Sequence, residues 1–361
     1  MLGERAKLFA GKSLSVIVAS LNERERQVLE AVIETYVETA EPAGSRTIAR
    51  RFGLALSPAT IRNTMSALEE KGYLYHPHTS AGRIPTDLAY RVYVNSLMRL
   101  AQVSASDSHQ IREELSDRSA VDQILQRAAQ VLGVLTKELG VAVVPTLDEA
   151  VLEGLDLLQA GSDRLLLVLT LKSGAVRTIF VEVPAVMAPE VLGQVALVLN
   201  ERLAGLRLRE IRATLSERLR DAAPDPDSSE LLNIFIQEAD DLFDVPATGV
   251  APGGVLLGSA QLLAGQPEFA TKERLQGLME VTERREILRE ALARRLGQGL
   301  TITIGSEHEA ATLAPFTLVT ASYRLGPLAG VIGVMGPTRM PYDKIVALVD
   351  HTSRLVGELL E

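Results

Sequence analysis

The chain of 361 residues contains no cysteine, only five histidines and no long apolar run. Without cysteine, disulfides and thiolate-bound zinc or iron–sulfur centres are excluded, and a reducing cytoplasm fits this composition. No apolar stretch approaches the roughly 18 residues that a bilayer-spanning helix needs. The apolar run 14–19 is too short for a signal sequence, so we expect residues 1–20 to be a frayed leader. We therefore expect a cytoplasmic protein of two or three domains without membrane contact.

The residue types that carry enzyme chemistry are scattered along the chain. No Gly-x-Ser-x-Gly nucleophile turn occurs, and the five histidines are scattered along the chain. His76 and His78 have the spacing of metal ligands, but no third ligand lies near them in the sequence. The glycine-rich stretch 249–258 lacks the Gly-Lys-Ser and Gly-x-Gly-x-x-Gly patterns that hold nucleotide phosphates. The sequence thus predicts a binding protein, not an enzyme, with no metal and no cofactor.

The net charge of −9 is unevenly distributed. Residues 45–100 contain eight arginines and lysines against three acidic residues, which leaves this segment at +5 and the remainder at −14. A basic module on an acidic body is the electrostatic pattern of a protein that binds DNA through one domain.

Residues 21–100 have the sequence pattern of a winged helix-turn-helix domain. A capping box of Asn22 and Glu25 predicts the start of a first amphipathic helix. Ser45 is expected to cap a second helix and Ser57 a third, and a glycine follows each of these two helices. A short hairpin with a polar turn comes next and forms the wing. A helical domain whose third helix is only structural remains the alternative on this pattern alone.

The third helix separates into a core face and a polar face. Ile61, Met65 and Leu68 recur at helical spacing and are expected in the core. The other side carries the residues that we expect to read bases: Ala59, Thr60, Arg62, Asn63 and Ser66. Arginine can bond a guanine through two hydrogen bonds and asparagine an adenine, and methyl groups suit a thymine methyl. A solvated helix face would more usually carry glutamate and lysine.

The remaining predicted DNA contacts come from the neighbouring elements. Arg46 faces outward from the second helix, and Ser57 stands where the third helix begins. Thr79, Ser80 and Arg83 lie at the tip of the wing. Small hydroxyl groups and an arginine suit contact with phosphates or with the minor groove.

Beyond residue 100 the pattern changes from helices to alternating strands and helices. The polar stretch 101–119 predicts a hinge or an exposed helix. The expected strands are 164–171, 175–183, 300–304, 316–323 and 329–335. The expected closing helix is 342–360. Together these elements predict an α+β fold with one sheet, interrupted by an inserted subdomain. The predicted parts are 101–219 and 298–361 for the sheet domain and 220–297 for the insert.

Several strings resemble the HrcA family of heat-inducible transcription repressors. The strongest are Ser-Pro-Ala-Thr-Ile-Arg-Asn at 57–63 and His-Thr-Ser-Ala-Gly-Arg-Ile-Pro-Thr-Asp at 78–87. Two more are Ile-Gly-Ser-Glu at 304–307 and Gly-Val-Met-Gly-Pro-Thr-Arg-Met at 333–340. The resemblance begins at residue 22 and runs to the end of the chain. His308 follows the glutamate where the family usually has asparagine.

The resemblance implies more than the residue patterns do. It implies a winged-helix DNA reader, a GAF-like domain and a dimerising domain inserted in the latter. It also implies a homodimer that represses chaperone operons by binding an inverted-repeat operator (CIRCE). The GroE chaperonin is implied as the partner that keeps the repressor active.

Two other functions stay open from the sequence. One is a metabolite-responsive winged-helix regulator with a small ligand in the GAF-like domain, which rests on fold analogy. The other is a structural dimer whose helix-turn-helix no longer binds DNA.

Overall fold

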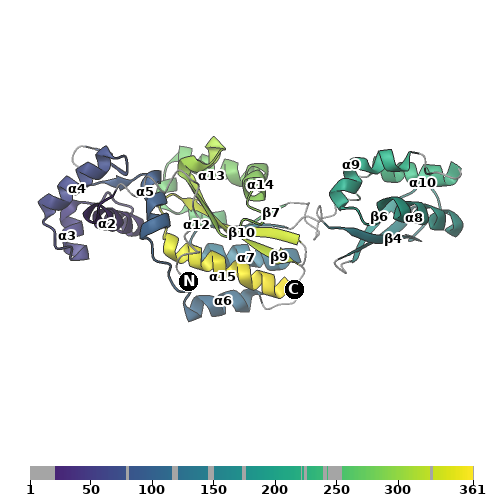
Figure 1. Cartoon of the computed structure of the whole chain (residues 1–361), viewed down its shortest axis with the longest axis horizontal. Coiled ribbons are helices and arrows are strands. Elements are labelled where there is room, and N and C mark those ends of the chain that lie inside the picture. Colours follow the sequence, from purple (N-terminus) through teal and green to yellow (C-terminus); the bar gives the residue numbers. More distant parts are fainter. Residues whose placement is uncertain are drawn as a thin grey trace. The chain divides into compact units, whose positions relative to one another are not determined.

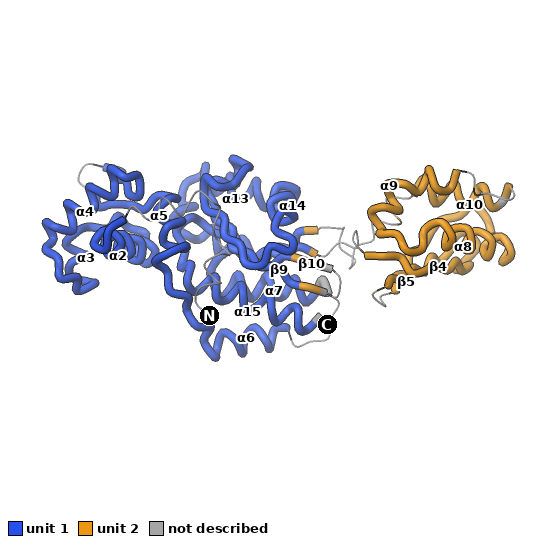
Figure 2. The backbone as a smooth tube through the Cα atoms, viewed as in Figure 1, with its two compact units in different colours: residues 1–143, 255–323, 331–359 blue, residues 144–254, 324–330, 360–361 orange. Residues whose placement is uncertain are grey.

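The computed structural model describes residues 21–360 apart from short gaps at 79–80, 116–120, 145–149, 173–175, 221, 223–225, 239–241, 243–253 and 326–327. The predicted leader, residues 1–20, lies outside the described residues. The chain divides into two compact units (Figure 2). Unit 1 comprises residues 1–143, 255–323 and 331–359, and unit 2 comprises 144–254, 324–330 and 360–361.

Unit 1 begins with the winged helix. Its elements are α2 (Glu23–Thr39), α3 (Ser45–Phe52), α4 (Pro58–Glu70), β1 (Leu74–Tyr75) and β2 (Ile84–Pro85). The capping box is confirmed, because the side chains of Asn22 and Glu25 accept hydrogen bonds from each other's backbone N–H at 2.9 and 3.0 Å. Gly53 and Gly72 have φ values of +55° and +79°, the left-handed conformation in which glycine carries no steric penalty.

The start of the second helix differs from the prediction. Gly44 is the N-cap of α3, and no side chain caps the helix there. Ser45 is instead the first helical residue and is buried. The backbone of Ala43 forms a β-bridge with Arg83 just before the helix. This bridge holds the chain so that α3 begins one residue earlier than the sequence predicts.

The segment after the wing is helical. It runs through α5 (Asp87–Val92), the π-helix η2 (Tyr93–Leu97), α6 (Ala105–Leu115) and α7 (Val121–Thr136). Within the described part of the predicted hinge, α6 packs on α7, and its Ile111 and Leu115 are buried. Those two side chains supply the apolar contact that a free hinge would lack.

A five-stranded sheet forms the centre of unit 1. The strand order is β7-β3-β10-β9-β8, and the described pairings of β3 with β7 and β10, and of β8 with β9, are antiparallel. The strands are β3 (Leu139–Val143), β7 (Val255–Leu257), β8 (Thr301–Ile304), β9 (Phe316–Leu325) and β10 (Leu328–Pro337).

Helices cover both faces of this sheet (Figure 1). On one face α12 (Ala260–Ala264), α13 (Lys272–Glu283) and α14 (Arg285–Ala293) bury Leu278 and Leu292 against Val141 and Met335. On the other face lie α7 and α15 (Tyr342–Leu360). The hydroxyl groups of Tyr342 and Thr317 are 3.3 Å apart on that side.

Unit 2 has its own sheet and core. Strands β4 (Leu152–Gln159), β5 (Arg164–Leu171) and β6 (Val176–Glu182) are antiparallel, in that order, and carry α8 (Pro189–Leu203), α9 (Leu208–Leu219) and α10 (Pro226–Gln237). Leu167, Val195 and Phe235 are fully buried between the sheet and these helices. The strand predicted at 164–171 is confirmed.

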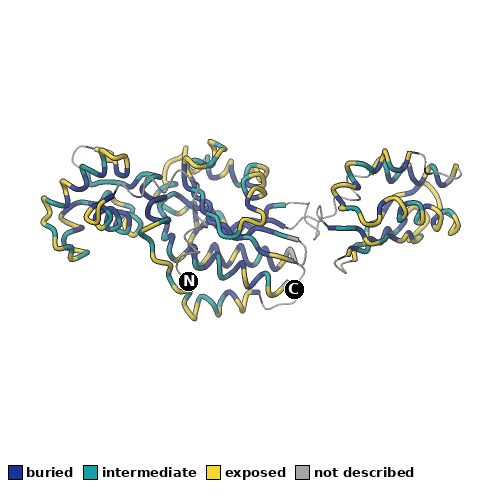
Figure 3. Tube along the Cα trace, in the orientation of Figure 1, coloured by how far each residue is buried: buried dark blue, intermediate teal, exposed yellow. Residues whose placement is uncertain are grey.

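One face of the unit 2 sheet is not covered by the described residues. Leu158, Leu166 and Phe180 lie opposite one another on adjacent strands of that face. Leu158 is 54% exposed and Phe180 is 64% exposed. Figure 3 draws exposed residues of the chain in yellow and buried ones in dark blue. Val176, farther along β6, is also exposed.

The division of the chain differs from the predicted boundaries, and the single predicted sheet is two sheets besides the wing. The inserted segment is 144–254 and not 220–297. The reason is strand pairing: Val141 lies opposite Leu257, so β7 returns directly beside β3 and everything between them leaves the first sheet. Helices α13 and α14, which lie within the predicted insert 220–297, pack on the five-stranded sheet of unit 1.

Candidate nucleic-acid interface

Helix α4 presents a buried face and an exposed polar face, as predicted. Ile61, Met65 and Leu68 are 0 to 3% exposed and hold α4 against the core. Arg62 and Asn63 are exposed, and neither side chain bonds to any residue in the described part of the chain. Their hydrogen-bonding groups are therefore available to a ligand.

The hydroxyl groups predicted to read bases are already engaged within the helix. Ser57 Oγ caps α4 by accepting the N–H of Thr60 at 3.1 Å and lies 2.9 Å from Thr60 Oγ1. Ser66 Oγ donates to the carbonyl of Arg62 at 3.2 Å. Ala59 is exposed but offers only a methyl group. The structure thus separates Arg62 and Asn63 from the other predicted residues.

Helix α3 adds a pair of exposed arginines. Arg46 and Arg50 are one turn apart, and neither forms an ion pair with the described residues. Like charges at this spacing repel each other by a few tenths of a kcal/mol, so their neutralisation by phosphates is favourable. Arg51 differs, because it pairs with Glu38 and lies over the Phe52 ring. Arg50 was not among the predicted contacts, although its spacing from Arg46 was visible in the sequence.

The wing is tied to its own domain. Arg83 pairs with Glu69 at 2.8 Å, and its side chain is only 20% exposed. A Cβ on Gly82 would come within 2.5 Å of the Ala43 carbonyl, so the glycine permits close approach of the chain to itself. His76 also pairs with Glu69. Thr79 and Ser80 lie outside the described residues, and DNA contact by the wing stays a prediction.

The strings that carry the family resemblance meet around α5. Arg91 donates to Glu307 Oε1 at 2.7 Å and to the carbonyl of Ile302 at 2.8 Å. Asp87 accepts the backbone N–H of Ser306 at 2.8 Å. Residues more than 200 positions apart in the sequence thus fix the winged helix to the five-stranded sheet.

A second anchor joins α2 to the loop after β10. Arg339 donates to the carbonyl of Val37 at 2.7 Å and to Glu268 at 3.0 Å. Burial is the largest influence and lowers the pKa of the Arg339 guanidinium, but the hydrogen bonds that it donates to Glu268 and the neighbouring negative charge of Glu268 act together and leave the pKa raised. Arg339 therefore acts as a permanent cation inside unit 1.

Comparison with known proteins decides the family. Residues 122–346 match the family model described as the HrcA protein C terminal domain, which covers more than half of the chain. A relative from Chlorobium phaeobacteroides (strain BS1), named "Heat-inducible transcription repressor HrcA", is 40% identical, with 92% of this chain and 96% of the relative aligned. The chain belongs to the HrcA family. A Geobacter sulfurreducens relative of the same name is 34% identical, with 95% of this chain and 99% of the relative aligned.

Two further comparisons concern the fold. Residues 18–82 match the model of the LexA DNA binding domain, which confirms a winged-helix DNA-binding domain ahead of the HrcA domain. A solved structure titled "Crystal structure of a hypothetical protein at 2.2 A resolution" has a TM-score of 0.55 at 23% identity and covers 94% of this chain and 99% of its own. That likeness supports the α+β fold alone. Among the described helices, none is both long and apolar enough to cross a membrane.

Proposed function

We propose that this HrcA-family chain is a dimeric transcription repressor of heat-shock (chaperone) operons. The observation that carries the proposal is the exposed face of α4, where Arg62 and Asn63 have no partner among the described residues. Two such helices on a two-fold dimer reach successive major grooves, so the operator is an inverted repeat. The bound dimer represses the operon because it blocks transcription at the operator.

The exposed residues divide into two tasks. Arg62 and Asn63 read base edges, since a guanidinium fork and a carboxamide match guanine and adenine in the major groove. Arg46 and Arg50 contact phosphates, which sets the orientation of α4 without reading sequence. Ser57 acts through its cap, because its hydroxyl holds the first turn of α4.

Operator binding by single variants tests this division. Arg62→Ala and Asn63→Ala should each cost about 1–3 kcal/mol of operator affinity and relax selectivity at one base position. Arg50→Ala should weaken binding to all sequences alike and flatten the dependence on salt. Fluorescence anisotropy on an inverted-repeat operator and on a scrambled duplex measures both effects.

The control is Arg289→Ala, which removes the same charge from the exposed side of α14, outside the winged helix. It should bind the operator like the wild type. Unchanged selectivity in both the Arg62 and the Asn63 variant would show that α4 does not read bases through these residues.

The open face of the unit 2 sheet supports the dimer. Leu158 and Phe180 are large apolar side chains left more than half exposed on adjacent strands. Exposed apolar patches of this kind mark interaction surfaces. A second copy of the chain is the occupant that a two-fold operator requires, and unit 2 is then the dimerising insert.

The operator and the chaperonin partner rest on the family resemblance. The CIRCE inverted repeat is the expected operator, and GroE is expected to keep the repressor in its active fold. When unfolded proteins occupy GroE, the repressor loses that fold and the operator is vacated. A stability margin of about 1–2 kcal/mol suffices to change the active fraction several-fold. Footprinting with and without GroE tests this step; equal protection at equal repressor concentration would argue against the chaperonin.

A regulator that responds to a small molecule is the second candidate. The observation in its favour is a cavity of about 220 Å³ in the five-stranded domain, lined by charged, polar and apolar side chains.

A further inference from the structure

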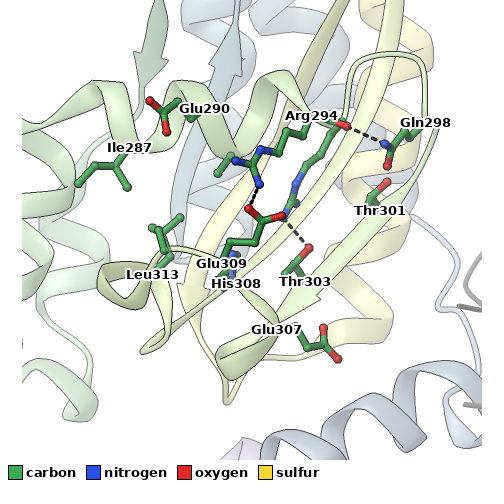
Figure 4. A pocket seen from close by; sticks show the side chains of 13 residues that line it. Ile287, Glu290, Arg294, Gln298, Thr301, Thr303, Glu307, His308, Glu309 and Leu313 are labelled. Carbon is green, nitrogen blue, oxygen red and sulfur yellow. Dashed lines mark hydrogen bonds and ion pairs between the residues drawn. The ribbon is translucent and has the colours of Figure 1, made fainter. Parts of the chain in front are cut away.

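The cavity lies where α14 ends beside β8 and the short helices η4 (Gly305–Glu307) and η5 (Ala311–Leu313). Its wall includes Arg295 and His308. Figure 4 shows His308 near Thr303, with Arg294 paired to Glu309 above it. A volume of about 220 Å³ holds several waters or one small organic anion, and it is below the size of pockets for drug-sized ligands.

Arg295 is a buried charge without a counter-charge among the described residues. Its residue is 6% exposed. The guanidinium donates to Thr303 Oγ1 at 2.6 Å, to Thr320 Oγ1 at 3.2 Å and to the carbonyl of Leu318 at 3.4 Å. All three acceptors are neutral, and an arginine has five N–H groups, so donors remain. A buried cation held only by neutral groups is costly unless an anion joins it.

His308 adds a second unused polar atom in the same wall. Its Nε2 is buried and meets no hydrogen-bond partner in the described part of the chain. Burial and the nearby charge of Arg295 lower the pKa of His308 to about 4. The imidazole is therefore neutral at pH 7 and can share one hydrogen bond with a ligand.

The carboxylates around the cavity do not neutralise Arg295. Glu307 pairs with Arg91, and Glu309 pairs with Arg294. Glu290 lies on the exposed side of α14 and forms no described ion pair. The described carboxylates that line the cavity therefore leave Arg295 without an ion pair.

We propose that this cavity binds a small oxyanion, a phosphate- or carboxylate-bearing metabolite, with Arg295 as its counter-ion and His308 Nε2 as a hydrogen-bond partner. The arrangement suits oxygen ligands, because a guanidinium fork matches the geometry of a phosphate or carboxylate. The proposal rests on the five-stranded domain and not on operator binding. Its failure would leave the repressor function untouched, and failure of operator binding would leave the cavity untouched.

Thermal unfolding of the full chain tests the proposal with two probes, inorganic phosphate and succinate, against sodium chloride at matched ionic strength. One of the two should raise Tm saturably, by roughly 2–4 °C at saturation, because it binds only the folded state. A response to phosphate alone identifies a tetrahedral ligand, and a response to succinate alone a carboxylate. If neither salt raises Tm above the chloride control, the proposal is wrong.

Three variants locate the response. Arg295→Met should abolish it, whereas Arg289→Met, which removes an exposed charge from α14, should retain it. Ala291→Leu places a larger side chain in the cavity wall and leaves Arg295 intact, so it should also abolish the response and decides the matter if Arg295→Met does not fold. Isothermal titration with the active probe should show binding to the wild type and to Arg289→Met, and no binding to Arg295→Met or Ala291→Leu. A wild-type response in Arg295→Met and Ala291→Leu would place the anion elsewhere and overturn the proposal.

Discussion

The two sheets of this chain differ in what covers them. Helices pack on both faces of the five-stranded sheet of unit 1, whereas the described helices of unit 2 pack on one face of its three-stranded sheet. In unit 1 the apolar side chains of the sheet are buried by these helices and stabilise the fold. In unit 2 a row of large apolar side chains, Leu158, Leu166 and Phe180, stays on the uncovered face. The two sheets therefore differ in the role of their apolar side chains: those of unit 1 hold the fold together, and those on the open face of unit 2 are the ones that the proposed dimer would use.

The covered sheet of unit 1 contains glycines at positions where its neighbours pack too closely for a side chain. A Cβ on Gly140 would lie 1.7 Å from the carbonyl oxygen of Ala129 in α7, and a Cβ on Gly333 would lie 2.1 Å from that of Val319 in β9. These glycines let backbones approach more closely than any side chain allows. Where no helix packs, large side chains can occupy the same kind of strand.

The largest expected effect is on Gly140. Gly140→Val should destabilise unit 1 by more than about 4 kcal/mol, because the atoms it meets are backbone atoms of α7 that cannot rotate away. Urea unfolding followed by circular dichroism measures the loss. Gly277→Ala in α13 is the control, since its Cβ meets nothing within 4 Å, and it should be neutral or stabilising. Equal stability of both variants would show that α7 is not seated on this strand.

Two neighbouring leucines of β5 compare the faces of the unit 2 sheet directly. Leu167 is fully buried, whereas Leu166 points to the uncovered face. Leu167→Ala should cost about 2–5 kcal/mol, and Leu166→Ala about 1 kcal/mol or less in dilute protein. Urea unfolding of both variants at low concentration measures the difference. A similar loss in both would mean that a part of the same chain covers the open face.

The smallest effect on the fold, and a large one on assembly, is expected from Phe180→Asp. The charge on the open face should convert dimers to monomers and weaken operator binding, while unit 2 keeps its helix content. Light scattering coupled to size exclusion measures the mass. Leu197→Asp is the control, because Leu197 is 61% exposed on α8, away from the sheet. If Phe180→Asp remains a dimer, the copies meet through another surface.

Short-range patterns predicted most of the winged helix. The capping box at Asn22, the cap at Ser57 and the split of α4 into a core and a polar face depend on residues a few positions apart. The strand β5 also follows from alternation within one segment. Such features are set by local hydrogen bonds and side-chain spacing, which a sequence displays directly.

Long-range contacts account for the wrong bounds of the insert and for the ion pairs that the sequence did not reveal. The insert was placed at 220–297 because a strand pattern does not say which sheet a strand joins, and only the pairing of β7 with β3 reveals the excursion 144–254. The pairing of Arg83 with Glu69 was not visible in the sequence, and DNA contact by Arg83 stays a prediction. The hydroxyls of Thr60 and Ser66 form local hydrogen bonds with Ser57 and with the carbonyl of Arg62, and their contact with bases stays a prediction.

The sequence by itself determined the family, the winged helix and the exposed pair Arg62 and Asn63, because strings of neighbouring residues encode each of them. Only the tertiary structure decided which charges remain unpaired. Arg91 and Arg295 look alike in the sequence, yet one is paired with Glu307 from the far end of the chain and the other is buried among neutral groups. Whether a charge needs a ligand depends on what lies within a few ångströms of it, and those neighbours come from distant parts of the chain.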